Sequence, residues 1–248
     1  MSHQRYTLTR ALTFAHFDCR GVSRPSALFD FMQDAATVHA HSLGLGTDDL
    51  SIVWALSRIT VEQSRPFYPG EALACETVFE GVKGPNWCRG FYFRDKTGAQ
   101  VAHAASTWVM LDADTHRLLR PKDRPACLSF VVQPGDGFTP PGKLSHDALT
   151  PHHVHTVRYS DLDANDHLNN VKIVDLIADG LELEHRDGQF VSGLQVNYTA
   201  ECRCGDALTL LTGHDERDTH YIFGRADGAD RFEAAARLSP YPSDRKDG

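Results

Sequence analysis

The stretch DLDANDHLNNVKIVDLIADGLEL, residues 161–183, joins a dense polar segment to an apolar pattern with helical spacing. The apolar positions of the pattern are Val171, Val174, Ile177, Ala178 and Leu181. Apolar residues at intervals of three and four predict an amphipathic helix, and Asn169 in front of it is a suitable N-cap residue. The polar segment holds acids, amides and an imidazole at a density that a solvated turn does not require. It therefore predicts a functional site at the start of a helix.

A second helical pattern lies near the N-terminus, in RPSALFDFMQDAATVHAHSLGLG, residues 24–46. Its apolar positions are Ala27, Leu28, Phe31, Met32, Ala35 and Val38. Pro25 suits the first turn of a helix, and Gly44 and Gly46 suit its end. We therefore expect a helix here that also buries one face.

The two helical patterns belong to an internal repeat. Asp18 lies 145 positions before Asp163, and the aspartates at 30 and 34 lie 145 positions before those at 175 and 179. Downstream, PGEAL (69–73) resembles CGDAL (204–208), and DKTGAQVAHAAS (95–106) resembles RADGADRFEAAA (225–236). Matches that keep their order along the chain predict two homologous halves. At the counterparts of 163, 165 and 167 the first half has Asp18, Arg20 and Val22, so only the second half holds the complete polar set.

Each half also contains segments typical of β-strands, rich in Val, Ile, Phe, Trp and Thr and broken by Gly and Pro. The expected strands are 6–14, 54–62, 72–80, 87–94 and 100–110 in the first half, and 153–159, 190–198, 207–213, 220–225 and 232–238 in the second. A strand, a long helix and four more strands predict an α+β unit in which an antiparallel sheet wraps around the helix. The expected domains are residues 1–125 and 151–248, joined by a linker at 126–150 with a short strand at 127–132.

Composition describes a globular chain and excludes several classes of function. Of the 248 residues, 41% are hydrophobic and 23% are charged, and no apolar run is long enough to span a membrane. The N-terminal MSHQRYTLTR lacks the layout of a signal peptide. A formal net charge of −8 argues against nucleic acid as a partner. One basic cluster, Arg117, Arg120, Lys122 and Arg124, is either a solvated loop or a docking site for an acidic partner.

The six cysteines are scattered, and none forms a CxxC pair. This spacing argues against a zinc site and a redox dithiol, and it indicates a reducing cytosol. The segment HHVH, residues 152–155, lies in an expected strand without a supporting acid cluster, which disfavours a metal site. No glycine-rich phosphate loop follows a strand. We therefore expect that the protein needs neither a metal ion nor an organic cofactor.

A long helix wrapped by a sheet and preceded by the pattern DxDxNxHxNN, residues 161–170, resembles the hotdog fold. Two such units with NYTAEC (197–202) downstream resemble the acyl-acyl-carrier-protein thioesterases of bacteria and plant plastids. The resemblance covers nearly the whole chain, from FDCRGVSRPSALFDFMQDAA (17–36) to AECRCGDAL (200–208). It implies hydrolysis of a fatty acyl-carrier protein to free fatty acid. Plant members carry a transit peptide, and the sequence shows none before its first motif, so we expect a bacterial protein of the cytoplasm. Because the second half holds the complete polar set, the first half is free to supply the acyl pocket.

Thioester hydrolysis needs a nucleophile and donors for the developing oxyanion, whereas the thiolate is already a good leaving group. The start of a helix offers free N–H groups and a partial positive charge that polarise a carbonyl. Asn165 is expected to position a water or donate to the carbonyl oxygen, His167 to take a proton or hold a water, and Asp163 to orient either one. Asp161 and Asn170 are expected to be cap and turn residues.

Two neighbouring residues compete for the remaining catalytic role. Glu201 would act as a general base from a strand of the same half, and the family resemblance implies a functional acid or cysteine at this place. Cys202 together with His167 and Asn165 would instead form a nucleophilic set. Because neighbouring side chains on a strand point to opposite faces, only one of the two is expected to face His167. We favour the carboxylate.

Three other functions compete with thioester hydrolysis on a carrier protein. A hotdog hydratase has a pattern similar to D-x-N-P-x-H, which differs from the spacing of Asn165 and His167. A non-catalytic acyl-thioester sensor would need a DNA-binding segment, which the sequence does not offer. An acyl-CoA thioesterase would use the same site and is the hardest to exclude. Neither the acyl chain length nor the oligomeric state, a homodimer included, follows from the sequence.

Overall fold

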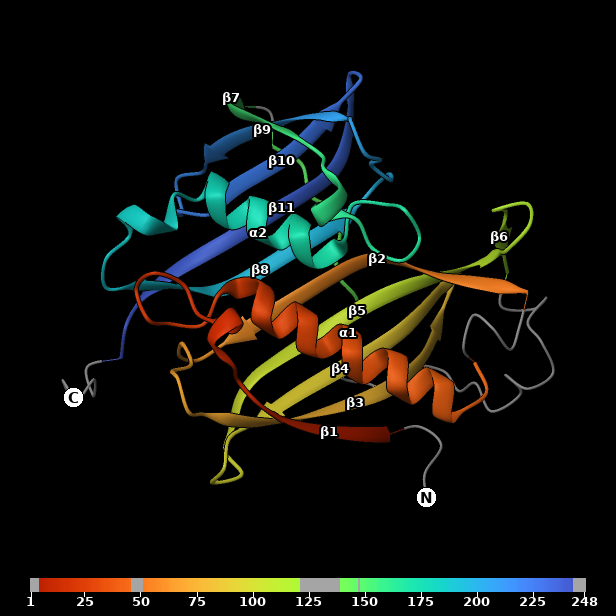
Figure 1. The fold of residues 1–248 in the computed structure, drawn as a ribbon, viewed down its shortest axis with the longest axis horizontal. Helices are drawn as coiled ribbons and strands as arrows, with labels where there is room; N and C mark the ends of the chain where they lie inside the picture. The colour runs from red at the N-terminus through yellow and green to blue at the C-terminus, as the bar shows by residue number, and fades with distance from the viewer. Residues whose placement is uncertain (1–4, 46–50, 121–138, 147, 243–248) are drawn as a thin grey trace. The chain divides into compact units, whose positions relative to one another are not determined.

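A computed structural model describes residues 5–45, 51–120, 139–146 and 148–242 of the chain. Within these residues lie two α-helices, α1 (Pro25–Ser42) and α2 (Asn170–Gly180) (Figure 1). Short 3-10 turns occur at η1 (Phe14–His16), η4 (Tyr159–Asp161) and η5 (Leu183–His185). No helix in this described part of the chain has the length and apolar character that crossing a membrane requires.

The chain divides into two compact units, and neither is continuous in the sequence. One comprises Met1–Arg10, Phe31–Val61 and Ala72–Gly142, and the other comprises Ala11–Asp30, Glu62–Glu71 and Lys143–Gly248. The second unit therefore contains two segments from the N-terminal half of the sequence. The domain boundaries at 125 and 151 stay a prediction.

The strands of the two halves follow the same order. The first half has β1 (Arg5–Ala11), β2 (Ile52–Gln63), β3 (Ala72–Lys83), β4 (Asn86–Arg94), β5 (Gln100–Asp112) and β6 (Leu118–Leu119), in the order β1-β3-β4-β5-β2 with β6 paired to β5. The second half has β7 (Thr150–Thr156), β8 (Gln189–Tyr198), β9 (Ala207–His214), β10 (His220–Ala226) and β11 (Ala229–Pro240), in the order β7-β9-β10-β11-β8. The pairs with a resolved register are all antiparallel.

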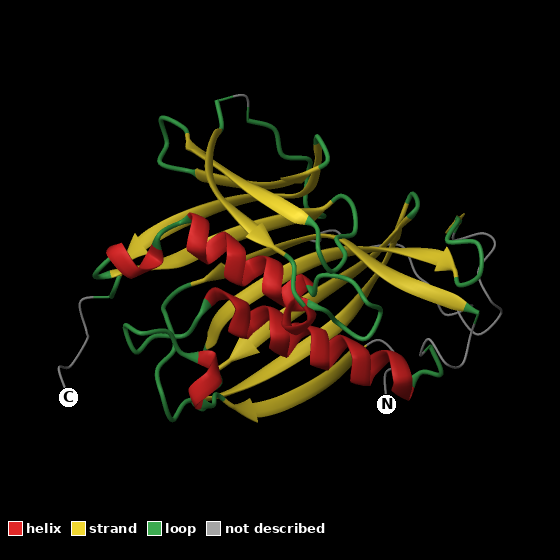
Figure 2. Cartoon of the chain, turned by 45° about the horizontal axis from the view of Figure 1, so that its top comes forward, coloured by secondary structure: helices red, strands yellow, loops and turns green. Residues whose placement is uncertain are grey.

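In each unit the helix lies against one face of the strands (Figure 2). Phe31 of α1 meets Phe93 of β4 edge to face, with ring centroids 5.6 Å apart, and both side chains are fully buried. In the second unit Ile177 of α2 is buried. Gly180 at the end of α2 packs so closely on β10 that a Cβ added to it would lie 2.9 Å from Cγ2 of Ile222. Burial of these apolar faces is the main favourable term in folding, and it explains why each helix needs its sheet.

The predicted α+β fold, with one helix wrapped by an antiparallel sheet in each half, is confirmed. α1 begins at Pro25 and is followed by Gly44 with a φ of +68°, as the sequence indicated. Gly46 and the expected strand at 127–132 lie outside the described residues. One predicted core position is wrong, because Val38 is 41% exposed.

The strands expected at 6–14 and 153–159 are wrong at their ends. β1 ends at Ala11 and β7 covers Thr150–Thr156, and each is followed by a 3-10 turn, η1 or η4. The aromatic residues Phe14 and Tyr159 favour strand structure by propensity, yet both are exposed, at 95% and 88%. Because these two side chains bury no apolar surface, strand pairing would not be stabilised by them, and a prediction from propensity alone put the strand ends too late.

Candidate active site

The polar segment forms a closed turn between η4 and α2, which we name the polar turn (residues 161–169). Three backbone contacts join its two arms. They are the Asn169 N–H to the Asp161 carbonyl (2.9 Å), the antiparallel bridge between Leu162 and Leu168, and the Asp163 N–H to the His167 carbonyl (2.8 Å). These contacts hold a tip of three polar or small residues, Ala164, Asn165 and Asp166, at the start of the helix.

Asp163 holds the tip of the polar turn through backbone groups. Its Oδ1 accepts hydrogen bonds from the N–H groups of Asn165 (2.8 Å) and His167 (3.4 Å). The chain reverses through Asp166, whose φ of +62° lies in the left-handed region, which Asp tolerates better than most residues. Asp163 thus constrains the backbone from which the Asn165 and His167 side chains project.

The helix α2 begins directly behind the polar turn, and Asn169 caps it. The Oδ1 of Asn169 accepts a hydrogen bond from the N–H of Val171 (2.7 Å), so the N-cap prediction is confirmed. Asn170 is the first residue of α2, and its carbonyl accepts a hydrogen bond from the hydroxyl of Tyr198 (3.3 Å). The positive end of the helix dipole therefore lies beside the polar turn.

A second loop, the acid loop (residues 199–206), brings a carboxylate to the polar turn. The N–H of Leu168 donates to the carbonyl of Cys202 (2.8 Å) and joins the two loops. Beside this bond, Nε2 of His167 lies 3.0 Å from Oε2 of Glu201, and their side chains are 19% and 55% exposed. An imidazole and a carboxylate within hydrogen-bond reach and open to solvent can share a proton and hold a water.

The prediction that Glu201 lies on a strand is wrong. β8 ends at Tyr198 and β9 begins at Ala207, so residues 199–206 form a loop. The alternation of side chains along a strand therefore does not separate Glu201 from Cys202. Their surroundings do, because Glu201 contacts His167 whereas Cys202 is only 3% exposed.

The Cys202 thiol is poorly suited to act as a nucleophile. Burial raises its pKa to about 11, so the reactive thiolate is a minor form at neutral pH. Cys19 and Cys204, in contrast, are exposed. We expect iodoacetamide at pH 8 to alkylate Cys19 and Cys204 in the folded protein at least about tenfold faster than Cys202.

Mass spectrometry of tryptic peptides can measure these rates separately, because Arg203 divides Cys202 from Cys204. Labelling of Cys202 as fast as that of Cys204 would contradict the buried state of the thiol. It would also restore Cys202 as a candidate nucleophile.

The first half contains the same turn without the acid–imidazole pair. In the first-copy turn (residues 16–24), the three contacts are the Arg24 N–H to the His16 carbonyl (2.8 Å), the bridge between Phe17 and Ser23, and the Asp18 N–H to the Val22 carbonyl (2.9 Å). Oδ1 of Asp18 accepts from the N–H groups of Arg20 (2.9 Å) and Val22 (3.3 Å), as Asp163 does in the second half. Gly21, with a φ of +73°, stands where Asp166 stands. The internal repeat thus extends to individual hydrogen bonds.

Arg20, at the counterpart of Asn165, makes the first-copy turn a structural cross-link. Its Nε and Nη2 lie 2.9 and 2.8 Å from Oδ2 of Asp18. Its Nη1 donates to the carbonyls of Arg186 (3.0 Å) and Gln189 (3.1 Å), in the chain that leads from η5 into β8. The first copy therefore uses its charged residues to join segments.

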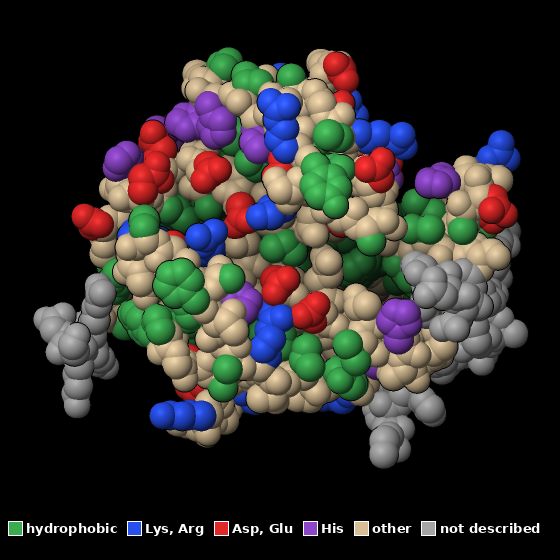
Figure 3. Space-filling model, viewed as in Figure 1, with side chains coloured by type: hydrophobic (Ala, Val, Ile, Leu, Met, Phe, Trp, Pro, Cys, Tyr) green, Lys and Arg blue, Asp and Glu red, His purple; other side chains and the backbone are tan. Residues whose placement is uncertain are grey.

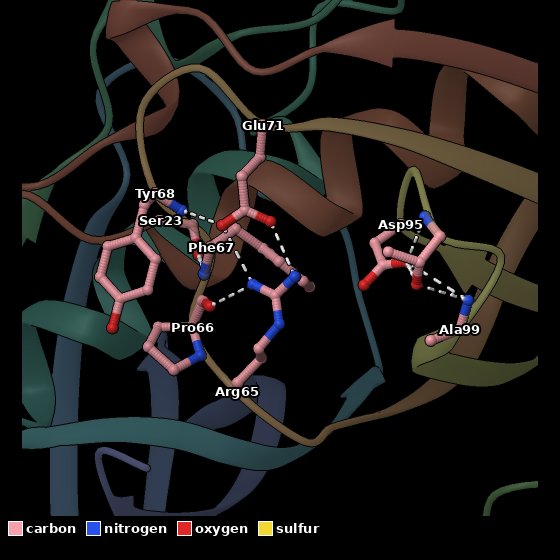
Figure 4. Close-up of polar contacts among 9 residues, drawn as sticks. Ser23, Arg65, Pro66, Phe67, Tyr68, Glu71, Asp95 and Ala99 are labelled. Carbon is pink, nitrogen blue, oxygen red and sulfur yellow. Dashed lines mark hydrogen bonds and ion pairs between the residues drawn. The ribbon is translucent and has the colours of Figure 1, made fainter. Parts of the chain in front are cut away.

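In the first half, the counterpart of the acid loop is closed by hydrogen bonds between its own residues (Figure 4). Pro66 stands 135 positions before Glu201 and offers no carboxylate. The nearby Glu71 instead receives two bonds from Arg65, at 3.0 and 2.8 Å, and one from the Tyr68 N–H (2.8 Å). Ser23 Oγ accepts the N–H of Phe67 (3.1 Å), which ties the loop to the first-copy turn.

The remaining sequence candidates have other surroundings. Asp161, expected to be a turn residue, accepts the Arg158 N–H (2.9 Å) and also lies 2.8 Å from His155, a contact that the sequence analysis missed. A signal for it was available, since a histidine and an aspartate flank the end of an expected strand. His152, His153 and His155 lie in β7, and no group of three or more His, Cys, Asp or Glu suited to a metal ion occurs among the residues that the structure describes.

The repeated arrangement of one long helix against an antiparallel sheet defines a double hotdog protein. Solved structures share this fold over nearly the whole chain. An acyl-ACP thioesterase from Bacteroides thetaiotaomicron VPI-5482 has a TM-score of 0.86 at 22% identity, covering 96% of this chain and 100% of that one. The 12:0-ACP thioesterase from Umbellularia californica has a TM-score of 0.79 at 23% identity, covering 95% and 97%. At such identities the likeness shows the fold.

Sequence comparison gives the family. Residues 4–124 match the acyl-ACP thioesterase N-terminal domain and residues 145–237 match the acyl-ACP thioesterase C-terminal domain. The chain belongs to the acyl-ACP thioesterase family, and the resemblance noted in the sequence is confirmed.

Two curated relatives come from plants. The chain is 29% identical over 212 residues to a chloroplastic dodecanoyl-[acyl-carrier-protein] hydrolase of Cinnamomum camphora, covering 75% of this chain and 53% of the relative. It is 27% identical over 212 residues to the chloroplastic oleoyl-acyl carrier protein thioesterase 1 of Arabidopsis thaliana, covering 74% and 56%. The chain thus spans about half the length of the curated relatives it matches.

Proposed function

We propose that this protein hydrolyses the thioester of a fatty acyl group on acyl-carrier protein and releases the free fatty acid. The observation that carries the proposal is the contact of 3.0 Å between His167 Nε2 and Glu201 Oε2 at the start of α2. Family membership supports it, because the relatives named above act on acyl groups bound to carrier protein.

In the proposed reaction, water attacks the thioester carbonyl carbon while Glu201 accepts one of its protons. The negative oxygen that develops is stabilised by the positive end of α2 and by the side-chain amide of Asn165. The carbon–sulfur bond then breaks, and the carrier thiolate takes the proton back by way of His167. The products are a carboxylic acid and the carrier thiol, and no cofactor enters the balance.

The two halves have different proposed roles. Residues 151–248 supply the four site residues Asp163, Asn165, His167 and Glu201. Within this set Asp163 is proposed to act through the turn, because the bonds that it makes go to backbone N–H groups. Residues 1–125 are proposed to supply the acyl pocket, which fits the loss of the amide and imidazole from the first-copy turn.

The proposed partner is an acidic carrier protein, and the proposed location is the cytoplasm. On the face drawn in Figure 3, Lys and Arg side chains lie among Asp and Glu side chains. Because the net charge of −8 repels an acidic carrier, docking of the carrier requires a local basic area on the surface. Arg117 and Arg120 remain candidates for it, whereas Lys122 and Arg124 lie outside the described residues. A homodimer stays an open expectation.

The substrate test compares carriers. We expect kcat/KM for a fatty acyl-carrier protein to exceed that for the acyl-CoA of the same chain length by at least about tenfold, because a protein carrier adds contacts beyond the shared arm. Release of free thiol, followed across octanoyl to stearoyl chains on both carriers, measures the ratio and the preferred length.

Equal or better turnover of acyl-CoA would replace the carrier-protein assignment with an acyl-CoA thioesterase. Absence of thiol release from both series would overturn thioester hydrolysis itself. Wild-type protein dialysed against chelator serves as a control and is expected to keep its full rate.

A further inference from the structure

Asp161 forms the base of the polar turn and is held from three sides. Its carbonyl accepts the N–H of Asn169 (2.9 Å), the residue that caps α2. Its carboxylate accepts the N–H of Arg158 (2.9 Å) and lies 2.8 Å from Nε2 of His155. Burial raises the pKa of the Asp161 carboxyl, but the hydrogen bonds from Arg158 and His155 outweigh it, so the pKa lies below its ordinary value. The carboxylate is therefore ionised at neutral pH.

His155 reaches this carboxylate from β7, and that strand is also tied to the acid loop. Two residues beyond His155, the N–H of Val157 donates to the carbonyl of Asp206 (3.0 Å). The N–H of Gly205 donates back to the carbonyl of Val157 (2.9 Å). The segment that carries the imidazole thus contacts both loops that form the candidate site.

The first half has a side chain with the same backbone contact at the position that corresponds to Asp161. At the counterpart of Asp161, His16 accepts the N–H of Thr13 through Nδ1 (2.8 Å), just as Asp161 accepts the N–H of Arg158. The other ring nitrogen of His16, Nε2, lies 3.6 Å from Oδ2 of Asp30 in α1. In the second half the corresponding partner comes from β7 instead of the helix. Only in this half does the anchored turn carry the amide and imidazole.

We propose that His155 is a positioning residue for the reaction. Bonded to Asp161, its imidazole holds the base of the polar turn, which keeps His167 within reach of Glu201 and beside the start of α2. His155 touches neither the substrate nor the reacting atoms. As far as it concerns turnover, this inference rests on the proposed function.

A graded series of substitutions tests the inference. His155→Gln places an amide nitrogen near the position of Nε2, whereas His155→Asn is too short and His155→Ala has no donor. We expect kcat to fall by about tenfold in the Ala and Asn variants, with KM changed less than about twofold, because the turn is displaced while the substrate contacts remain. The Gln variant is expected to stay within about twofold of the wild type. His152→Ala, on an exposed residue of the same strand, is the matched control and should keep the wild-type rate.

Hydrogen exchange at the N–H of Asn169 provides a readout that does not depend on turnover. It is expected to quicken in the Ala and Asn variants and to return to the wild-type rate in the Gln variant. A lower melting temperature with unchanged kcat, or a Gln variant as impaired as the Ala variant, would overturn the positioning role. If the wild type hydrolyses no acyl thioester, the proposed function fails. In that case quickened exchange still supports the anchor and unchanged exchange overturns it.

Discussion

Replacing His167 with alanine, or Glu201 with glutamine, is expected to lower kcat for acyl-carrier-protein hydrolysis by on the order of a hundredfold or more. The two groups lie 3.0 Å apart. In the proposed reaction, removal of Glu201 takes away the proton acceptor of the attacking water, and removal of His167 takes away the group that holds it. Asn165→Ala is expected to have a similar effect through loss of a donor to the developing oxyanion. Single-turnover measurements with saturating enzyme report the chemical step directly.

The thiol beside Glu201 provides the matched control. Cys202→Ala should keep most of the activity, because this cysteine is buried and mostly protonated. If the Cys202 variant is dead and the Glu201 variant active, or if an acyl-cysteine is trapped, a covalent mechanism through Cys202 replaces the general-base mechanism. Thermal unfolding should change little in the His167 and Glu201 variants, since both lie on loops and neither is a core residue.

Asp18→Ala is expected to lower the free energy of unfolding by about 3 kcal/mol while kcat of the folded protein stays within about twofold of the wild type. The carboxylate accepts two backbone N–H groups and pairs with Arg20, whose side chain is only 10% exposed. Its removal leaves a mostly buried guanidinium without this counter-charge. Chemical denaturation measures the loss, and turnover per folded molecule measures the activity.

Asp18→Asn separates the two contributions of that carboxylate. The amide oxygen can still accept the N–H groups of Arg20 and Val22, so this variant should be destabilised less than Asp18→Ala. A hundredfold fall in kcat for the folded Asp18 variants would contradict the purely structural role of the first-copy turn.

The internal repeat was the part of the sequence that predicted most. The offset of 145 residues that pairs Asp18 with Asp163 also pairs their backbone hydrogen bonds and the left-handed residues Gly21 and Asp166. Helix α2 and its Asn169 cap followed from local rules, because an N-cap depends on bonds within a few residues. Composition predicted the interiors of the strands. It did not predict the ends of β1 and β7, because these depend on whether Phe14 and Tyr159 are buried, which the rest of the fold decides.

The partners of the site residues were less accessible from sequence. Glu201 was expected on a strand, and the choice between it and Cys202 rested on alternation along that strand. In the structure both lie in a loop, and the two side chains differ in their surroundings, because Cys202 is buried whereas the Glu201 carboxylate meets His167. The pattern HHVH indicated only a poor metal site at His155. Its contact with Asp161, six residues further on, follows from the 3-10 turn η4 after β7, where the sequence predicted a continuing strand.

By itself the sequence determined the two-fold plan of this protein, its helix starts, and the half in which the polar set is complete. These follow from periodicity and from hydrogen bonds between residues close along the chain. The tertiary structure alone decided which carboxylate meets His167, how Arg20 turned the first copy into a cross-link, and where His155 anchors the polar turn. The first two join segments that are distant in sequence, and such contacts form only when burial of the helices against their sheets brings the loops together. His155 and Asp161 are six residues apart and meet because the 3-10 turn η4 follows β7.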